Sequence, residues 1–182
     1  MDHPGTGAQL MVIWIIGLSG SGKTTLGREV ARQWRDSGAN CVLLDGDEIR
    51  ELFRHDSGHE PYSVEGRRIN AERMTSLCEL LDRQGVNVVC CILSIFQDMR
   101  DENRTRFSRY FEIFMDAPLD TLQRRDVKGH YAAALRGTTK NFVGIDIPFE
   151  RPTGMDLVID SSGDRADIQT LAHDALKKAG VM

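Results

Sequence analysis

The stretch Gly17-Leu-Ser-Gly-Ser-Gly22-Lys23-Thr24 decides the fold of this chain, because it fits the pattern G-x-x-x-x-G-K-[ST]. It follows the apolar run Met11–Ile16, which predicts a buried strand, and it opens the amphipathic run Lys23–Ser37, which predicts a helix. Glycines let the backbone turn tightly, so that successive N–H groups converge on phosphate oxygens, and the following helix presents its positive end to the same anion. The motif therefore predicts a phosphate-binding loop rather than a glycine-rich turn without a ligand.

Each side chain of this loop has a predicted task. Lys23 reaches the β- and γ-phosphates of a nucleoside triphosphate as a point charge, and the Thr24 hydroxyl ligates Mg²⁺. ATP and Mg²⁺ are thus the predicted cofactors. The predicted ATP-binding residues of the loop are Gly17, Ser19, Gly20, Ser21, Gly22, Lys23, Thr24 and Thr25.

Outward from the loop, short apolar runs alternate with amphipathic ones. The predicted strands are Met11–Ile16, Cys41–Leu44, Val86–Leu93, Tyr110–Met115 and Leu157–Ile159. The predicted helices are Lys23–Ser37, Glu65–Gln84, Thr121–Val127 and Ala166–Ala179. Near-continuous apolar strands are typical of a parallel sheet covered on both faces. The pattern predicts an α/β fold of the P-loop NTPase type: a three-layer sandwich with a doubly wound, five-stranded parallel sheet and helices on both faces.

Size and composition narrow the function classes. The 182 residues suffice for one domain, predicted over residues 11–182 after a flexible leader at residues 1–10. Hydrophobic residues make up 41% and charged residues 27% of the chain, as in globular proteins. The formal net charge of −4 gives no basic face for nucleic acid or for an anionic membrane, so neither is a predicted partner. Leu10–Ile16 is too short to span a bilayer and lacks signal-peptide flanks, which predicts a cytoplasmic protein.

The chain has four cysteines, at positions 41, 78, 90 and 91. None forms a C-x-x-C pair, and three of them fall inside predicted strands. We interpret all four as small buried thiols without a metal or redox role.

Two carboxylates follow the second predicted strand. Asp45 and Asp47 come directly after Val42-Leu43-Leu44, and a 2-1-3 strand order would set them beside the phosphate loop. A kinase that acts on an alcohol needs a carboxylate to orient the hydroxyl, accept its proton or hold a metal-bound water. We therefore predict Lys23, Asp45 and Asp47 as catalytic residues and Thr24 and Asp45 as metal ligands. The alternative is that Asp47 only caps the helix that follows.

Further motifs make the chain recognisable as a whole. In order they are Gly17–Thr25, Leu44–Asp47 with Arg50, Tyr62-Ser63, Arg67, Asn70, Ser94, Arg125–Gly129, Asn141–Asp146 and Pro148–Glu150. In this series the chain resembles the adenosine-5′-phosphosulfate (APS) kinase family over most of Met11–Ser161. The combination is far more specific than the phosphate loop alone. Gluconate and shikimate kinases share the loop and the carboxylate, but they do not account for Arg125–Gly129 or for the stretch from Phe142 to Glu150.

The resemblance implies transfer of the γ-phosphoryl group of ATP to the 3′-hydroxyl of APS. It implies that Arg125 flanks the ATP nucleotide. The acceptor-binding residues that it implies are Asp47, Arg50, Tyr62, Arg67, Asn70, Ser94, Lys128 and Phe142. Among these, Tyr62 and Phe142 would sandwich the acceptor base, and Lys128 would lie in a mobile lid over the phosphates. It also implies a homodimer.

Each of these roles has a plainer alternative. Arg67 lies with Arg68 and Arg73 in a long predicted helix, whose charges are usually a solvated face. Phe142 fits an ordinary core position, and Arg124–Lys128 fits a surface run.

The sequence departs from the family around the acceptor. Leu93-Ser94-Ile95-Phe96-Gln97 stands where APS kinases typically have Ile-Ser-Pro-Tyr/Phe-Arg. Glu51-Leu52-Phe53 replaces a His-Gly-Leu segment, and Gly66 stands in place of an aspartate. These changes resemble a branch that includes cytidine diphosphoramidate kinase, which phosphorylates the ribose of a different nucleotide. We therefore predict APS as the acceptor and keep cytidine diphosphoramidate as the alternative, which leaves sulfate assimilation and polysaccharide decoration both open. A hypothesis of another class is a nucleotide-binding regulatory module without turnover.

Overall fold

The computed structural model describes residues 10–53, 60–126, 129–163 and 167–182. Its centre is a parallel sheet of five strands in the order β2-β3-β1-β4-β5. The strands are β1 (Val12–Ile16), β2 (Cys41–Asp45), β3 (Asn87–Ile92), β4 (Tyr110–Asp116) and β5 (Leu157–Asp160). The predicted doubly wound α/β fold is confirmed.

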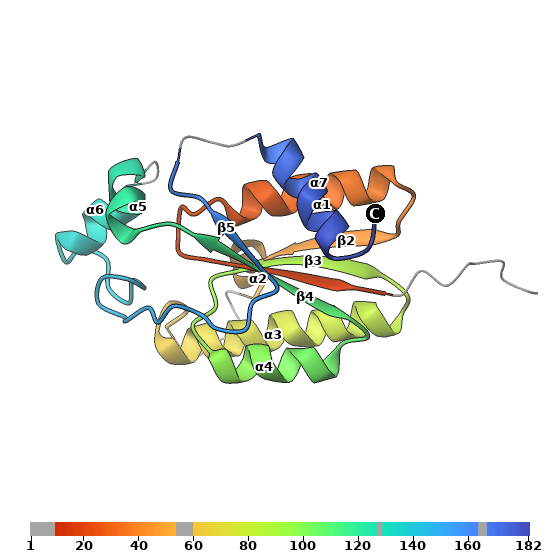
Figure 1. Cartoon of the computed structure of the whole chain (residues 1–182). Helices are drawn as coiled ribbons and strands as arrows, with labels where there is room; N and C mark the ends of the chain where they lie inside the picture. Colours follow the sequence, from red (N-terminus) through yellow and green to blue (C-terminus); the bar gives the residue numbers. More distant parts are fainter. Residues whose placement is uncertain (1–9, 54–59, 127–128, 164–166) are drawn as a thin grey trace, which may run out of the picture.

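The helices lie on both faces and at one end of this sheet (Figure 1). They are α1 (Lys23–Asp36), α2 (Gly46–Leu52), α3 (Val64–Arg83), α4 (Gln97–Arg106), α5 (Leu119–Arg125), α6 (His130–Leu135) and α7 (Ile168–Lys178). Helices α1 and α7 cover one face, α3 and α4 cover the other, and α5 and α6 lie beyond the carboxyl ends of the strands (Figure 1). In parallel α/β sheets ligands bind at this end.

The predicted 2-1-3 strand order is wrong. β3 lies between β1 and β2, pairing with both, so β2 is at the edge of the sheet. The chain runs from β1 through α1 to the edge strand and later returns through α3 to fill the gap. Strand order depends on such long-range pairing, on which the local hydrophobic pattern carries no information.

Helix α4 was not predicted, because its sequence lacks an apolar stripe. The buried positions of Gln97–Arg106 are Arg100 and Asn103, which are polar. Arg100 Nε lies 3.4 Å from a Glu112 carboxylate oxygen, so charge pairing and not apolar periodicity fixes this helix against β4. Helix α6 was also not predicted, and its six residues are too few to show a helical period.

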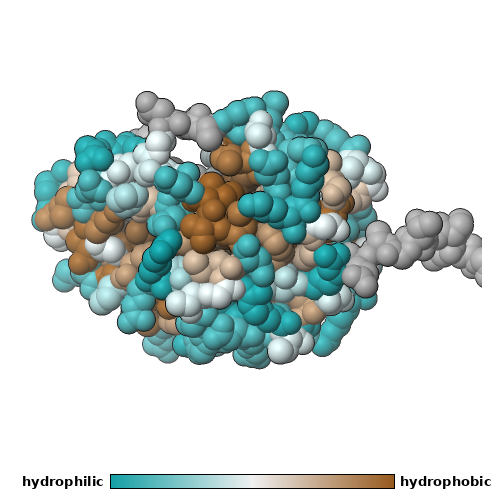
Figure 2. All heavy atoms as spheres, viewed as in Figure 1, coloured by the Kyte–Doolittle hydropathy of each residue, from teal (hydrophilic) through white to brown (hydrophobic). Residues whose placement is uncertain are grey.

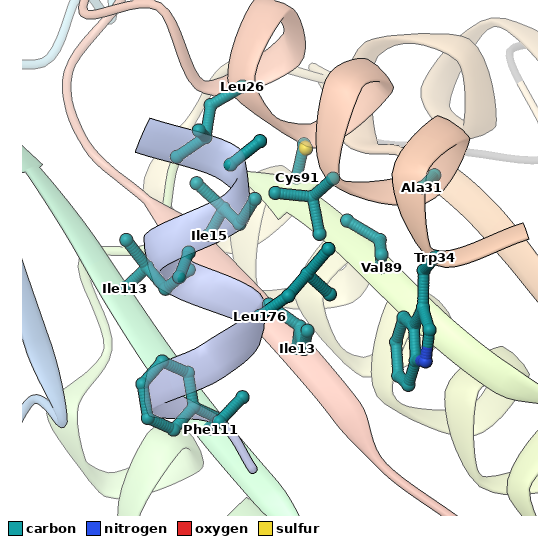
Figure 3. Packing of buried hydrophobic residues seen from close by; sticks show 14 of the residues in the cluster. Ile13, Ile15, Leu26, Ala31, Trp34, Val89, Cys91, Phe111, Ile113 and Leu176 are labelled. Atoms are coloured by element: carbon teal, nitrogen blue, oxygen red, sulfur yellow. The ribbon is translucent and has the colours of Figure 1, made fainter. Parts of the chain in front are cut away.

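Alternation along the strands divides the core between the two faces. Ile13 and Ile15 of β1 face α1 and α7, where they pack with Leu26, Ile113 and Leu176 (Figure 3). Val12, Trp14 and Ile16 face α3 and α4. All five residues of β1 are buried, as expected for the central strand of a covered sheet. The four cysteines are buried and free, which confirms the interpretation of them as core thiols.

A third and smaller core lies at the carboxyl end of the sheet. Its buried residues come from the phosphate loop, the end of β4, α5, α6 and the following segment: Leu18, Ala117, Leu122, Tyr131, Val143 and Ile147. Polar side chains cover most of the face shown in Figure 2, while apolar ones gather near its centre and at the end that carries α5 and α6. Within the described ranges, no helix combines the length and apolar character needed to cross a membrane.

Candidate active site

The phosphate loop follows β1 and opens α1, as predicted. Gly17 has a φ of 153°, and a Cβ there would lie 2.6 Å from Ser21 Oγ and 2.7 Å from the Met115 carbonyl oxygen. Gly22 has a φ of 96° and is the residue before the first turn of α1. Both positions need glycine, one for space and one for its left-handed conformation.

Two polar side chains of the loop, Lys23 and Ser21, bear directly on phosphate binding. Lys23 Nζ donates to the Leu18 carbonyl oxygen at 2.8 Å, which holds the ammonium group over the loop. Ser21 is 2% exposed, and its hydroxyl has no hydrogen-bond partner among the described residues. A buried hydroxyl without a partner is costly, so this group favours a polar ligand in the loop.

Thr24 and Asp45 join the loop to the end of β2. Thr24 Oγ1 donates to Asp45 Oδ2 at 2.6 Å, and Asp45 is 7% exposed. The other carboxylate oxygen of Asp45 accepts from the Asp47 backbone N–H at 2.9 Å, which makes Asp45 the N-cap of α2. The helix is therefore capped by Asp45, whereas the sequence alternative gave this task to Asp47.

Asp47 lies on the outer side of the same turn. Its side chain is 81% exposed, and Oδ1 accepts from Arg50 at 2.6 Å. The two predicted catalytic carboxylates thus differ in environment: Asp45 is buried against the phosphate loop, and Asp47 faces solvent beside an arginine.

Asp45 reaches Thr24 although β3 separates β2 from β1, because α1 begins over β3. The Cys91 thiol on β3 donates to the Lys23 carbonyl oxygen at 3.4 Å. A Cβ on Gly27 would lie 2.2 Å from the Cys91 sulfur, so only glycine allows this close approach. Figure 3 shows Cys91 pointing from the sheet toward α1. This role of Cys91 is not predictable from the sequence, because the contact joins residues distant along the chain.

Two arginines meet around one aromatic ring near the start of α3. The guanidinium carbon of Arg50 lies 4.9 Å from the centroid of the Tyr62 ring, and that of Arg67 lies 5.7 Å from it. Asn70 Nδ2 donates to the Gly46 carbonyl oxygen at 3.3 Å. The Tyr62 side chain is half exposed, whereas Arg67 and Asn70 are buried. The solvated-face alternative for Arg67 is therefore wrong.

Two guanidinium groups lie close together in this cluster, defined as Arg50, Tyr62, Arg67 and Asn70, with the Asp47 carboxylate bonded to Arg50. Burial, and next the neighbouring Arg50 charge, lower the pKa of Arg67 from its ordinary value. Arg50 Nε and Asn70 Oδ1 are buried without a hydrogen-bond partner in the described part of the chain. An anion would offset the repulsion and would accept from the arginines, so the cluster has the charge and the donors for one.

Arg67 also ties the cluster to the segment after α6. Its Nε donates to the Tyr62 carbonyl oxygen and its NH2 group to the Asn141 carbonyl oxygen, both at 2.9 Å. One guanidinium group thus holds Tyr62 close to the residue before Phe142. The Asp146 carboxylate accepts from the backbone N–H of Asn141 at 2.6 Å and from that of Phe142. These bonds fix Asn141 in a left-handed conformation with a φ of 61°.

Two further predicted site residues, Ser94 and Arg125, lie at the same end of the sheet. Ser94 is buried directly after β3. Arg125, the last residue of α5, donates to the carbonyl oxygens of Ser161 at 2.6 Å and Ser162 at 2.8 Å, which joins α5 to the segment after β5. Lys128 lies outside the described residues.

The donor set near Thr24 fits Mg²⁺ better than a transition metal. No group of three or more His, Cys, Asp or Glu side chains that would hold a metal occurs in the described ranges. Mg²⁺ prefers oxygen ligands and is usually bound by one or two protein groups together with substrate phosphates. Thr24 and Asp45, hydrogen-bonded to each other beside the loop, offer such oxygens.

Comparison with known proteins places these features in a family. The family model described as adenylylsulphate kinase matches residues 9–160. A probable adenylyl-sulfate kinase of Pseudomonas aeruginosa is 40% identical over 157 residues, which cover 86% of this chain and 70% of that protein. The cytidine diphosphoramidate kinase of Campylobacter jejuni is 38% identical over 151 residues, covering 83% of this chain and 86% of that protein.

A solved structure agrees with the sequence relatives. The Mycobacterium tuberculosis APS kinase CysC, in complex with AMPPNP and APS, matches with a TM-score of 0.84 and 32% identity, over 94% of this chain and 98% of that one. The chain belongs to the adenylylsulphate kinase family, and it is a phosphotransferase that acts on a hydroxyl group.

Proposed function

We propose that this protein transfers the γ-phosphoryl group of ATP to the ribose 3′-hydroxyl of adenylyl sulfate, giving 3′-phosphoadenylyl sulfate. The observation that carries the proposal is the cluster of Arg50 and Arg67 around Tyr62, built from α2, which Asp45 caps, and from the start of α3. Its arginines can bind an anion and its aromatic ring can stack on a base, which supports a nucleotide acceptor.

On the ATP side, the loop residues Gly17 to Thr25 would wrap the phosphates. Lys23 would leave the Leu18 carbonyl oxygen, 2.8 Å away, for the β- and γ-phosphate oxygens. Mg²⁺ held by Thr24 and Asp45 would neutralise charge that develops on the transferring group. Arg125 would flank the nucleotide, as the family resemblance implies. Its hydrogen bonds to the carbonyl oxygens of Ser161 and Ser162 fix its guanidinium group beside the segment after β5.

The different surroundings of the two carboxylates suggest separate tasks. Asp45 is buried with both oxygens hydrogen-bonded, so we assign it to the metal side and to holding Thr24. Asp47 is exposed on the turn that leads to Arg50, so we assign it to orienting the acceptor hydroxyl and accepting its proton. Phosphoryl transfer depends mainly on positioning and charge, so a carboxylate with an ordinary environment is adequate for this task.

On the acceptor side, Arg50 and Arg67 would bind the phosphosulfate oxyanions. The unpartnered carbonyl oxygen of Asn70 would accept a hydrogen bond from an O–H or N–H group of the acceptor. Tyr62 and Phe142 would hold the base by stacking, at roughly 1–3 kcal/mol per base. Arg67 supports this arrangement because it bonds both Tyr62 and Asn141. Ser94 lies at the end of β3 toward the same acceptor, and Lys128 is proposed as a cation that closes over the phosphates.

A second candidate acceptor is cytidine diphosphoramidate. The match to the cytidine diphosphoramidate kinase covers 86% of that protein, and its 38% identity is close to the 40% of the probable adenylyl-sulfate kinase. In addition, Gln97 stands at the position where APS kinases typically have arginine. Its side chain donates to Asp101 at 2.7 Å and accepts from the Thr153 backbone N–H at 3.2 Å, so it supports the start of α4 and supplies no charge to an acceptor.

The test is release of ADP from MgATP with each acceptor, measured as kcat/KM in a coupled assay. We expect turnover with adenylyl sulfate at least tenfold above that with cytidine diphosphoramidate. The reverse order would establish the second candidate. Turnover with neither, while ATP binds, would support the regulatory-module hypothesis and contradict the proposal. A homodimer and a cytoplasmic location stay predictions, and sedimentation velocity and cell fractionation test them.

A further inference from the structure

Tyr131 of α6 contacts both halves of the site although it belongs to neither. Its hydroxyl donates to the Ser19 carbonyl oxygen of the phosphate loop at 2.8 Å. Its ring meets that of Phe142 edge-on, with centroids 4.8 Å apart and planes at 72°. Tyr131 is 2% exposed, so the ring fills the space between the two partners.

The position of this ring is fixed from its own helix. The Asp126 carboxylate accepts from the backbone N–H of Tyr131 at 3.1 Å and from that of Ala132 at 2.8 Å. These bonds satisfy two of the free N–H groups at the start of α6. The ring therefore moves together with α6, and a rotation of α6 would break the hydrogen bond from the Tyr131 hydroxyl to the Ser19 carbonyl oxygen.

The position of Phe142 is fixed by a second carboxylate. Asp146 accepts from the backbone N–H groups of Asn141 and Phe142, and Arg67 holds the Asn141 carbonyl oxygen. A shift of the Phe142 ring would therefore move the ring of Tyr131 as well. Close-packed rings transmit such displacements, because interiors have few voids to absorb them.

Tyr131 belongs to the third core at the carboxyl end of the sheet, and Phe142 packs against it. This core joins Leu18 of the phosphate loop to Val143 and Ile147 of the segment that carries Phe142. A Cβ on Gly144 would lie 3.0 Å from a Leu119 side-chain carbon, so this segment packs tightly against α5. This small core thus joins the phosphate loop, α5, α6 and the segment of Phe142 in one packed unit.

The tyrosine hydroxyl keeps its proton over the working range of a kinase. Burial, and next the Asp126 charge, raise the pKa of Tyr131 to about 12. It thus remains a donor to Ser19.

We propose that Tyr131 is a positioning residue that couples the two substrate sites: its ring supports Phe142 on the acceptor side, and its hydroxyl fixes the loop carbonyl at Ser19 on the ATP side. The inference rests on the proposed function. When acceptor stacks on Phe142, the third core orders around Tyr131 and the phosphate loop is held in its binding conformation. Binding of each substrate then favours binding of the other by the same factor, as linkage requires.

The variant Tyr131→Phe tests the coupling, because it keeps the ring beside Phe142 and removes only the hydroxyl. Calorimetric titration gives the Kd of adenylyl sulfate without nucleotide and with saturating AMPPNP and Mg²⁺. In the unmodified protein we expect AMPPNP to tighten adenylyl sulfate binding by about fivefold or more. In Tyr131→Phe we expect a factor below two, with the Kd of adenylyl sulfate alone changed less than twofold.

Tyr110→Phe is the matched control. Tyr110 is also a largely buried tyrosine, and its hydroxyl donates to Glu112 at 2.9 Å, on the face of the sheet covered by α3 and α4. This control should keep the full coupling factor. An unchanged factor in Tyr131→Phe, or an equal loss in Tyr110→Phe, would overturn the inference.

The same titrations separate the inference from the function on which it rests. If the unmodified protein binds adenylyl sulfate or cytidine diphosphoramidate and Tyr131→Phe retains the coupling, only the inference fails. If the unmodified protein binds neither, the proposed function and the inference both fail. A lowered melting temperature in Tyr131→Phe accompanied by weaker binding of each substrate alone would show a merely structural role and would also overturn the inference.

Discussion

The ATP side and the acceptor side of the site are built in different ways. The ATP side is built mainly on one continuous segment, the phosphate loop, and two of its side chains already hydrogen-bond within the protein: Lys23 to Leu18, and Thr24 to Asp45 of β2. The acceptor side is assembled from α2, α3 and the segment after α6, and it holds like charges close together. The first has the loop that many proteins use to bind a phosphate chain. The second holds Arg67 beside Arg50 and Asp47, and we propose that an anionic acceptor offsets the repulsion between the two arginines. We therefore expect the acceptor side to determine substrate specificity.

The largest expected effect comes from breaking the ATP side at its cation. Lys23→Ala removes the charge that reaches the β- and γ-phosphates, and we expect kcat/KM for ATP to fall about a thousandfold. Nucleotide affinity and turnover should both decrease, as measured by AMPPNP titration and steady-state kinetics. Retention of both would exclude Lys23 from the transfer and with it the division described above.

Asp45→Asn should separate metal use from folding. Asparagine caps a helix about as well as aspartate, so the melting temperature should hardly change. We expect kcat to fall about a hundredfold and the Mg²⁺ concentration for half-maximal rate to rise, with the Kd of AMPPNP nearly unchanged.

The companion variant Asp47→Asn keeps the Mg²⁺ dependence of the unmodified protein while lowering kcat. The two magnesium titrations therefore assign the carboxylates. Equal shifts in both variants would contradict the separate tasks proposed for Asp45 and Asp47.

Arg67→Lys sharpens the comparison from the acceptor side. Lysine keeps the charge but loses the planar fork that bonds Tyr62 and Asn141, so we expect KM for the acceptor to rise about 30-fold while KM for ATP stays within twofold. Arg68→Lys is the control on the neighbouring exposed position, where Arg68 pairs with Asp98. A rise in KM for ATP equal to that for the acceptor would mean that the two sides are not distinct.

The smallest expected effect on activity accompanies a clear effect on stability. Gly27→Ala places a Cβ 2.2 Å from the buried Cys91 sulfur, and we expect a loss of about 1–3 kcal/mol in the free energy of unfolding, measured with urea. In a Cys91→Ala background the clash is absent, and the same change should be neutral or should stabilise α1 by up to about 1 kcal/mol. Additive effects in the double mutant would contradict the close contact of α1 with β3.

The phosphate loop, the alternation of strands and helices and the covered sheet were all predictable from the sequence, because each leaves a local pattern. Strand order was not, since the pairing of β3 with β1 and β2 joins distant segments. Helix α4 was not predicted, because charge pairs such as that of Arg100 with Glu112, and not an apolar stripe, hold it against β4.

The acceptor residues could be named only through family resemblance, as Arg50 and Arg67 look like solvated charges in the sequence alone. Tyr131, Asp126 and Asp146 received no role at all. Their contacts depend on how α6 and the segment after it pack near the phosphate loop, and the spacing of apolar residues along the sequence does not predict this packing.

The most direct test of the account is the position of the transferred phosphate. After incubation with MgATP and adenylyl sulfate, the product can be examined by ³¹P–¹H correlation spectroscopy. The account predicts one new phosphorus resonance coupled to the ribose H3′ proton, formed in step with ADP. A phosphate coupled to H2′, or ADP formed without any phosphorylated nucleotide, would contradict transfer to the 3′-hydroxyl.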